Sequence, residues 1–185
     1  MKQNEIPLGY TRVSSILQPY STLSEIDPNV VAKAADRGTR VHAHCENYAL
    51  GLFLTEIEDD CKNYVNFFID WFDNMVASLL FTEQRMNCPN RKISGQFDMI
   101  AVLKGDRYPT LIDIKTPASP SLSWQLQTAA YRMMAKEILS VECTRRICLM
   151  LPKVGSMGKI VEYENHKKDE DLFLKALELY RFFER

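Results

Sequence analysis

The stretch Leu111-Ile112-Asp113-Ile114-Lys115-Thr116, read with Gly95-Gln96-Phe97-Asp98 before it, decides the predicted fold. Side chains along a strand alternate between two faces, so Asp113 and Lys115 are predicted to share one face among β-branched neighbours. Asp98 lies in the preceding run of strand character. Two carboxylates and one ammonium on one patch are the minimum set for a metal-dependent phosphodiester hydrolase.

The turn Lys104-Gly105-Asp106 predicts a hairpin between these two runs. If the hairpin folds about Gly105-Asp106, Asp98 lies opposite Asp113, with Cβ atoms about 5 Å apart. Two carboxylates that close repel each other, and a divalent cation between them removes the repulsion. The alternative is a pair of surface acids that are solvated separately.

The rest of the chain predicts a mixed sheet flanked by helices, an α/β (α+β) sandwich. An aromatic stripe at helical spacing from Asp60 to Leu80 could stack on nucleic acid, but the pattern favours a core-facing helix. Asp27-Pro28 begins a helix that Gly38-Thr39 divides and Gly51 ends. Helices are expected at 27–50, 60–80, 121–139 (begun by Ser119-Pro120 or by Ser121) and 169–183, and strands at 80–87, 92–103, 110–115, 146–151 and 159–163.

Composition indicates an ordinary globular chain without a general affinity for nucleic acid. The 185 residues are 46% apolar and 25% charged, with a net charge of −1. We expect one domain over 1–185, with a mainly helical part at 1–80, a sheet-bearing catalytic core at 81–163 and a C-terminal helix at 168–184. No membrane span, signal peptide or transit peptide is expected, which favours a cytoplasmic protein. The five scattered cysteines, without a Cys-x-x-Cys pair, are expected to be small buried apolar residues.

Two further pairs of polar residues occur at helical spacing. His42 and Glu46 are four residues apart, so they share a helix face from which both could reach a metal, whereas His44 points about 200° away from His42. Gln127 and Tyr131 are also four apart and could contact phosphate or orient Lys115. Each pair taken alone is explained more simply by ordinary structural or surface residues.

Taken in order, these pieces resemble the PD-(D/E)XK nuclease superfamily, and within it the RecB-like and phage-type exonucleases. The resemblance covers about Gly38 to Tyr131. It is carried by four motifs in sequence order: Gly38-Thr39-Arg40-Val41-His42-x-x-x-Glu46, Gly95-x-x-Asp98, Asp113-x-Lys115 and Gln127-x-x-x-Tyr131.

The resemblance implies a restriction-endonuclease-like core and a role for each motif residue. His42, Asp98, Asp113 and the backbone carbonyl of Ile114 would bind one or two Mg²⁺ or Mn²⁺ ions. Lys115 would be the catalytic lysine and would align the attacking water. Glu46 would be a supporting acid, and Glu83 would be a second one, ranked below it. Gln127 and Tyr131 would line the substrate channel.

The sequence also departs from the superfamily pattern. Phe97 stands where the superfamily name has proline, and because no cysteine precedes Cys45 or follows Cys148, an iron–sulfur cluster is not expected. The predicted substrate is linear single- or double-stranded DNA, held by local basic residues with an affinity that falls steeply with salt. The candidates are Arg37, Arg40, Arg91, Lys92 and Arg107.

The predicted activity is that of a metal-dependent DNA exonuclease in phage-type recombination or DNA processing. A structure-specific endonuclease on the same core, and a catalytically silent nucleic-acid- or protein-binding module, are the alternatives. The Gln127-x-x-x-Tyr131 pair and His42 favour the exonuclease branch. A separate recombination or single-strand-binding protein is the expected partner, and an oligomer is compatible with the resemblance.

Overall fold

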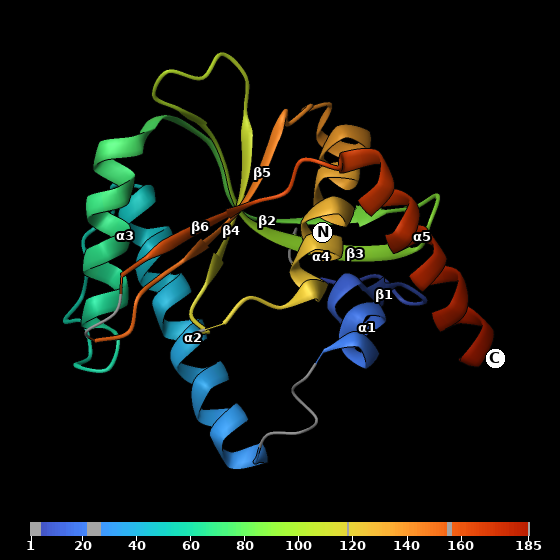
Figure 1. The fold of residues 1–185 in the computed structure, drawn as a ribbon, viewed down its shortest axis with the longest axis horizontal. Helices are drawn as coiled ribbons and strands as arrows, with labels where there is room; N and C mark the ends of the chain where they lie inside the picture. The colour runs from blue at the N-terminus through green and yellow to red at the C-terminus, as the bar shows by residue number, and fades with distance from the viewer. Residues whose placement is uncertain (1–4, 22–26, 118, 155–156, 185) are drawn as a thin grey trace.

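A computed structural model of the chain describes residues 5–21, 27–117, 119–154 and 157–184. Its centre is a six-stranded mixed sheet with helices on both faces, which confirms the predicted fold class (Figure 1). The strands are β1 (Thr11–Arg12), β2 (Val76–Cys88), β3 (Ile93–Leu103), β4 (Thr110–Lys115), β5 (Arg145–Met150) and β6 (Lys159–Glu162). They lie in the order β1-β3-β4-β5-β6, and β2 pairs with β3.

Helices of unequal length cover the two faces of this sheet (Figure 1). They are α1 (Val13–Leu17), a 3₁₀ turn (Gln18–Tyr20), α2 (Pro28–Ala49), α3 (Lys62–Met75), α4 (Leu122–Met134), a π-helical turn (Ala135–Leu139) and α5 (His166–Phe183). Alternation along β4 divides the core: Leu111 packs with α1, α4 and α5, whereas Ile112 and Ile114 pack with α2 and α3.

The predicted hairpin register is confirmed. Met99 pairs with Ile112 and Ala101 with Thr110 in antiparallel order, which is the predicted register. The ladder ends one residue before Asp98 and Asp113, where Asp98 Oδ2 accepts from the Ile114 N–H. Gly105 adopts a φ of +88° in the turn, a left-handed backbone that glycine reaches at little cost. Helix caps also follow the sequence, because the side chains of Asp27 and Ser121 accept from the backbone N–H groups of Asn29 and Ser123.

Several predicted boundaries are wrong. The second helix ends at Met75 rather than Leu80, because the chain from Val76 onward pairs with β3, starting opposite Leu103. Apolar periodicity alone does not separate a buried helix end from a strand start. The division at Gly38-Thr39 does not occur, since α2 is continuous and the Thr39 hydroxyl donates to the Ala35 carbonyl.

Two other differences concern the ends of the chain. The predicted elements did not include β1, α1 and the 3₁₀ turn, which pack beside β3 and α4. The last helix begins at His166, three residues before the predicted start. All five cysteines are buried free thiols, as expected, and no helix among the described residues has the length and apolarity to cross a membrane.

A fully buried ion pair joins β5 to α5 on the α4 side of the sheet. The Arg146 guanidinium donates to the Asp169 carboxylate, and neither side chain is accessible to solvent. Arg146 also donates to His166 Nδ1 and to the Gln125 carbonyl, both at 2.9 Å. The Gln125 amide donates at 2.7 Å to the second oxygen of Asp169. The network therefore compensates two charges that water does not reach.

We predict that Asp169→Asn lowers the free energy of unfolding by about 3–5 kcal/mol, because it leaves the Arg146 charge buried without its counterion. Urea unfolding at neutral pH measures this loss. The double substitution Arg146→Met/Asp169→Leu removes both charges and should lose less stability than the single one. Equal or greater loss in the double variant contradicts the electrostatic explanation.

Candidate active site

Asp98 is at the centre of the candidate site and connects three elements of the fold. Its side chain, on β3, is almost completely buried. The Ile114 backbone N–H on β4 donates to Asp98 Oδ2 at 2.5 Å, and His42 Nδ1 on α2 lies 3.1 Å from Oδ1. Burial raises the pKa of this carboxyl, but His42, Lys115 and the Ile114 N–H together hold it below its usual value.

Glu83 is the second acid beside His42, and it lies on β2 opposite Asp98. The ladder runs from Thr82–Met99 to Gln84–Phe97, which places Glu83 between them with a φ of +44°. A non-glycine residue in this left-handed region costs roughly 1–3 kcal/mol, a cost found often at functional sites. Gln96 donates to Glu83 Oε2 at 2.6 Å and accepts from Arg85 at 2.5 Å. The hydrogen bond from Gln96, which is itself fixed by Arg85, therefore orients the Glu83 carboxylate.

His42, Glu83 and Asp98 together form a group that could hold a metal ion. One ligand atom from each lies within 4.8 Å of the others. One imidazole nitrogen and two carboxylate oxygens suit Mn²⁺ and similar divalent ions, and the carboxylates also suit Mg²⁺. Burial lowers the pKa of His42, yet Asp98 and Glu83 raise it overall to about 10. The two carboxylates therefore create a local demand for positive charge, which a divalent cation would meet.

The structure places Glu83, which the sequence analysis ranks below Glu46, beside His42 and Asp98, and the sequence carries a signal for this position. The turn at Pro89–Lys92 fixes the β2–β3 register, with Cys88 opposite Ile93. The register argument that paired Asp98 with Asp113 across one turn therefore pairs Asp98 with Glu83 across the other. Glu46, the acid predicted from helical spacing, lies outside the three-residue group. Burial, and then the negative charge of Glu83, raises the pKa of the Glu46 carboxyl.

The predicted catalytic lysine is held by two partners. Lys115 Nζ lies 2.5 Å from Asp113 Oδ2 and donates to Gln127 Oε1 at 2.9 Å. Gln127 Nε2 donates in turn to the Tyr131 hydroxyl at 3.0 Å. Burial lowers the pKa of Lys115, but the carboxylates of Asp113 and Asp98 raise it well above its usual value. Lys115 is therefore an ammonium at neutral pH.

The structure thus brings together most of the predicted residues, in two adjoining groups. His42, Glu83 and Asp98 form the possible metal group, and Asp113, Lys115, Gln127 and Tyr131 form the lysine group. Asp113 joins the lysine group through Oδ2, and burial and Asp98 raise its pKa against the effect of Lys115. Metal ligation by Asp113 and by the Ile114 carbonyl stays a prediction. His44 points away, as expected, and pairs with Glu58 at 2.9 Å.

The predicted DNA-binding arginines do not all face the site. Arg40 binds both oxygens of Asp60 and also Asp36, so it fastens α2 to the segment before α3. Arg91 is paired with Glu137. These carboxylates occupy the donors that substrate phosphates would need, which argues against the substrate role predicted for Arg40 and Arg91. Arg37 differs, because its buried Nε has no hydrogen-bond partner among the described residues.

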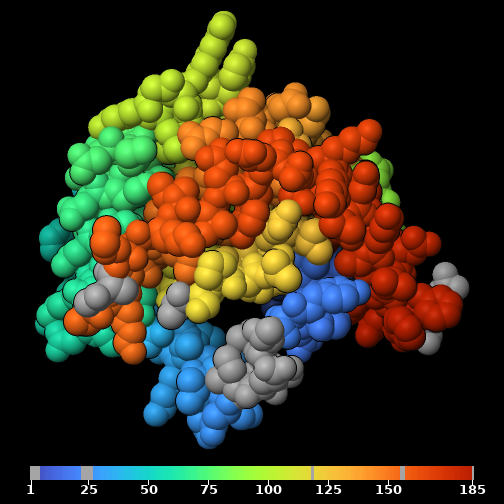
Figure 2. Space-filling model, in the orientation of Figure 1, coloured from blue at the N-terminus to red at the C-terminus, as the bar shows by residue number. Residues whose placement is uncertain are grey.

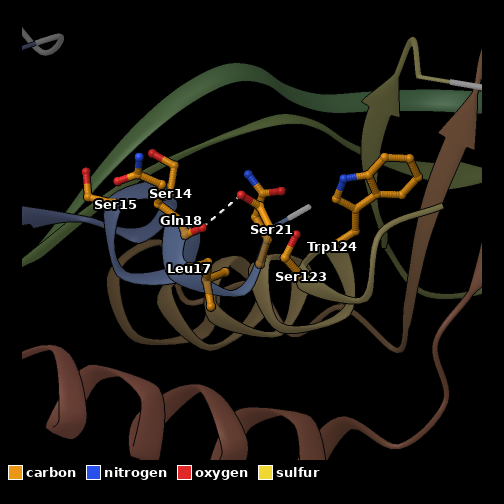
Figure 3. A pocket seen from close by; sticks show the side chains of 8 residues that line it. Ser14, Ser15, Leu17, Gln18, Ser21, Ser123 and Trp124 are labelled. Carbon is orange, nitrogen blue, oxygen red and sulfur yellow. Dashed lines mark hydrogen bonds between the residues drawn. The ribbon is translucent and has the colours of Figure 1, made fainter. Parts of the chain in front are cut away.

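A serine-rich hollow of about 370 Å³ adjoins the lysine group (Figure 3). Its walls come from α1, the 3₁₀ turn and the first turns of α4, with Gln127 at one side. Trp124, also in its wall, has its ring 5.4 Å from Lys115 Nζ. No charged residue lines it; the residues are Ser14, Ser15, Leu17, Gln18, Ser21, Ser123, Trp124 and Gln127.

Comparison with solved structures supports the fold. An inferred exonuclease from Eubacterium rectale aligns over 92% of this chain and 78% of its own, with 10% identity and a TM-score of 0.54. LHK-Exo, solved in complex with dAMP, aligns over 95% of this chain and 91% of its own, with 12% identity and a TM-score of 0.41. No family model and no curated protein sequence matches the chain. At 10% identity, the likeness to the Eubacterium rectale structure shows a shared fold and leaves the activity to be argued from the site.

The possible metal group makes a prediction about thermal stability. Saturating Mn²⁺ should raise the melting temperature of the wild type by several degrees, because a ligand that binds only the folded state stabilises it. Glu83→Gln and Asp98→Asn should lose this shift. Glu46→Gln removes an acid outside the group, so this variant should keep the Mn²⁺-induced shift. The assignment would be contradicted if Glu46→Gln lost the shift while Glu83→Gln and Asp98→Asn kept it. Differential scanning fluorimetry with Mn²⁺ or EDTA measures the shift.

Gly95 makes a second prediction, because a Cβ there would lie 2.7 Å from Cε1 of Tyr131. The ring must move to accept it, so Gly95→Ala should lower the free energy of unfolding by about 1–3 kcal/mol. Gly38→Ala is the matched control: its Cβ would meet only Thr116 Oγ1, at 3.5 Å, within a helix. It should be neutral or gain about 0.5–1 kcal/mol. Urea unfolding of both variants measures the difference, and equal effects would contradict it.

Proposed function

We propose that this protein is a divalent-metal-dependent nuclease that hydrolyses phosphodiester bonds of DNA from an end. The observation that carries the proposal is that two groups of opposite charge lie on neighbouring strands, linked by the hydrogen bond from the Ile114 N–H to Asp98. The carboxylates of Asp98 and Glu83 attract a cation, while the neighbouring Lys115 ammonium offers a fixed positive donor. A phosphodiester carries negative charge that increases at its oxygens during hydrolysis, and both groups are suited to stabilise that charge.

His42, Glu83 and Asp98 would hold the metal ion. When bound, a divalent cation neutralises charge on a phosphoryl oxygen and makes water a better nucleophile at neutral pH. The buried carboxylate of Asp98 is kept ionised by His42, Lys115 and the Ile114 N–H, so it is ready to bind a cation. Glu83 is oriented by Gln96, which limits its movement without adding a charge.

Lys115 acts as a donor rather than as a base, because its ammonium form is stabilised by Asp113 and Asp98. An ammonium has three N–H groups. Asp113 and Gln127 take two of them among the described residues, which leaves one for a phosphoryl oxygen or for the attacking water. Gln127 and Tyr131 are positioning residues in this scheme, since they fix the direction of Nζ.

The finer assignment, to a RecB-like or phage-type exonuclease in DNA processing, is part of the proposal. Its support is the order of the four motifs and the Lys115–Gln127–Tyr131 hydrogen-bonded chain that joins two of them. The likeness in fold to the Eubacterium rectale protein is consistent with it. The proposed ions are Mg²⁺ or Mn²⁺.

Digestion of end-labelled linear DNA tests the proposal. The wild type should release label with Mg²⁺ or Mn²⁺ and none with EDTA, while closed circular DNA stays intact. Lys115→Ala should lose at least about 100-fold in rate, the size of effect seen when a preorganised charge-stabilising donor is removed. Lys175→Ala, which removes an exposed lysine on α5, is the control and should keep full activity.

Three results would count against the proposal. Cleavage that persists in EDTA argues against metal dependence, and cleavage of closed circles argues for an endonuclease. No cleavage of single- or double-stranded DNA with either ion would favour a silent binding module.

A further inference from the structure

A second hollow, of about 440 Å³, lies where β4 ends and shares no residue with the serine-rich one. Thr116 and Pro117, the residues directly after Lys115, form part of its wall. The rest of the wall comes from α2, α3, Pro120 and the segment between β5 and β6. Figure 2 shows three of these segments meeting on one face: the blue start of α2, the yellow residues after β4 and the orange segment after β5.

The charge of this hollow is unusual for the chain. Arg37, Lys153 and Lys159 line it, and no aspartate or glutamate does. The whole sequence carries 24 acidic residues against 23 basic ones. Because the charged residues in the wall are all cations, they create a local positive potential beside the lysine group, although the protein as a whole carries no net positive charge.

Arg37 is placed in this hollow by close packing. A Cβ on its neighbour Gly38 would be 3.5 Å from Thr116 Oγ1, so α2 runs directly against the end of β4 at this point. The Arg37 guanidinium lies 5.5 Å from the centre of the Tyr64 ring. Neither Arg37 nor Lys159 has an ion-pair partner within the described ranges of the chain, and the buried Arg37 Nε has no hydrogen-bond partner there. The absence of ion-pair partners in the described part of the chain, rather than the buried Nε, is what leaves these two cations available to an anion.

The remaining lining of the hollow is mostly apolar. Tyr64, Met150, Leu151 and Met157 contribute side chains, with prolines at 117, 120 and 152. A duplex backbone presents phosphates and sugars on a convex surface, whereas an unpaired nucleotide also exposes the flat aromatic face of its base. Cations combined with aromatic and apolar groups are typical of sites that hold single strands.

We propose that this hollow binds one nucleotide unit of a single strand next to the bond that is cleaved. The phosphate lies against Arg37 and Lys159, and the sugar and base lie against the apolar lining. The inference rests on the proposed nuclease function, because it takes its ligand class from that function. It goes beyond that function by placing one nucleotide of the substrate in this hollow and by predicting a preference for an unpaired strand. The strand would then run from the hollow past Lys115.

Fluorescence anisotropy with a labelled single-stranded oligonucleotide tests the inference, with Lys115→Ala as background so that the strand stays intact. Arg37→Gln and Lys159→Gln should each weaken binding at least about five-fold. Each should also lower the slope of log affinity against log salt by about 0.7, the value for one phosphate contact on a single strand. Lys175→Gln makes the same charge change on α5 and should leave affinity and slope unchanged. Thermal unfolding checks that each variant is folded.

The outcomes separate this inference from the proposed function. Unchanged affinity and slope in both folded hollow variants would overturn the inference, while metal-dependent cleavage lost in Lys115→Ala would still support the nuclease. An equal loss of affinity on a blunt duplex would overturn the preference for an unpaired strand. Absence of any binding to single strands would also overturn it, whatever the cleavage assay shows.

Discussion

The compensation of one buried carboxylate, that of Asp98, is the constraint on which the site depends. A carboxylate removed from water is stable only when hydrogen bonds and opposite charges replace its hydration. Asp98 obtains them from a β4 backbone N–H and from His42 on α2. The need to compensate one charge therefore fixes the distance between the central hairpin and the longest helix. Glu83, on the other side of Asp98, adds a second negative charge to the same place.

A second set of contacts positions Lys115 from α4, on the face of the sheet opposite to α2. Gly95 leaves room for the Tyr131 ring, Tyr131 accepts from Gln127, and Gln127 accepts from Lys115. The glycine and the tyrosine are 36 residues apart in the sequence, yet one limits the position of the other by direct contact. This explains in physical terms why a small residue stands three positions before Asp98: a larger side chain would displace the ring that fixes the lysine.

The charges of the site also determine what can approach it. Acids surround the possible metal group, so a polyanion would be repelled there without a cation. The cationic hollow at the end of β4 and the neutral, serine-rich hollow beside Gln127 adjoin the lysine group and lack acids. A nucleic-acid strand that avoids the uncompensated carboxylates would follow these surfaces. Under the proposed function, a chain with a net charge of −1 would bind a polyanion through the local distribution of its charges.

The sequence by itself determined the features that local patterns encode. Alternation and the turn at Gly105 were sufficient for the β3–β4 register and for placing Asp113 and Lys115 on one face of β4. Helical spacing was sufficient to separate His42 from His44. These inferences succeed because strand alternation and helix pitch act over a few residues and do not depend on distant parts of the chain.

Only the tertiary structure decided the features that depend on distant partners. The chain changes from helix to strand at Val76 because β3 offers a pairing edge. Arg40 pairs with Asp60, which lies twenty residues away in the sequence. The left-handed backbone of Glu83, and with it the third ligand of the possible metal group, depends on β2 and β3 pairing on both sides of that residue. Such contacts join residues that no periodic pattern relates, so they form only when the chain has folded.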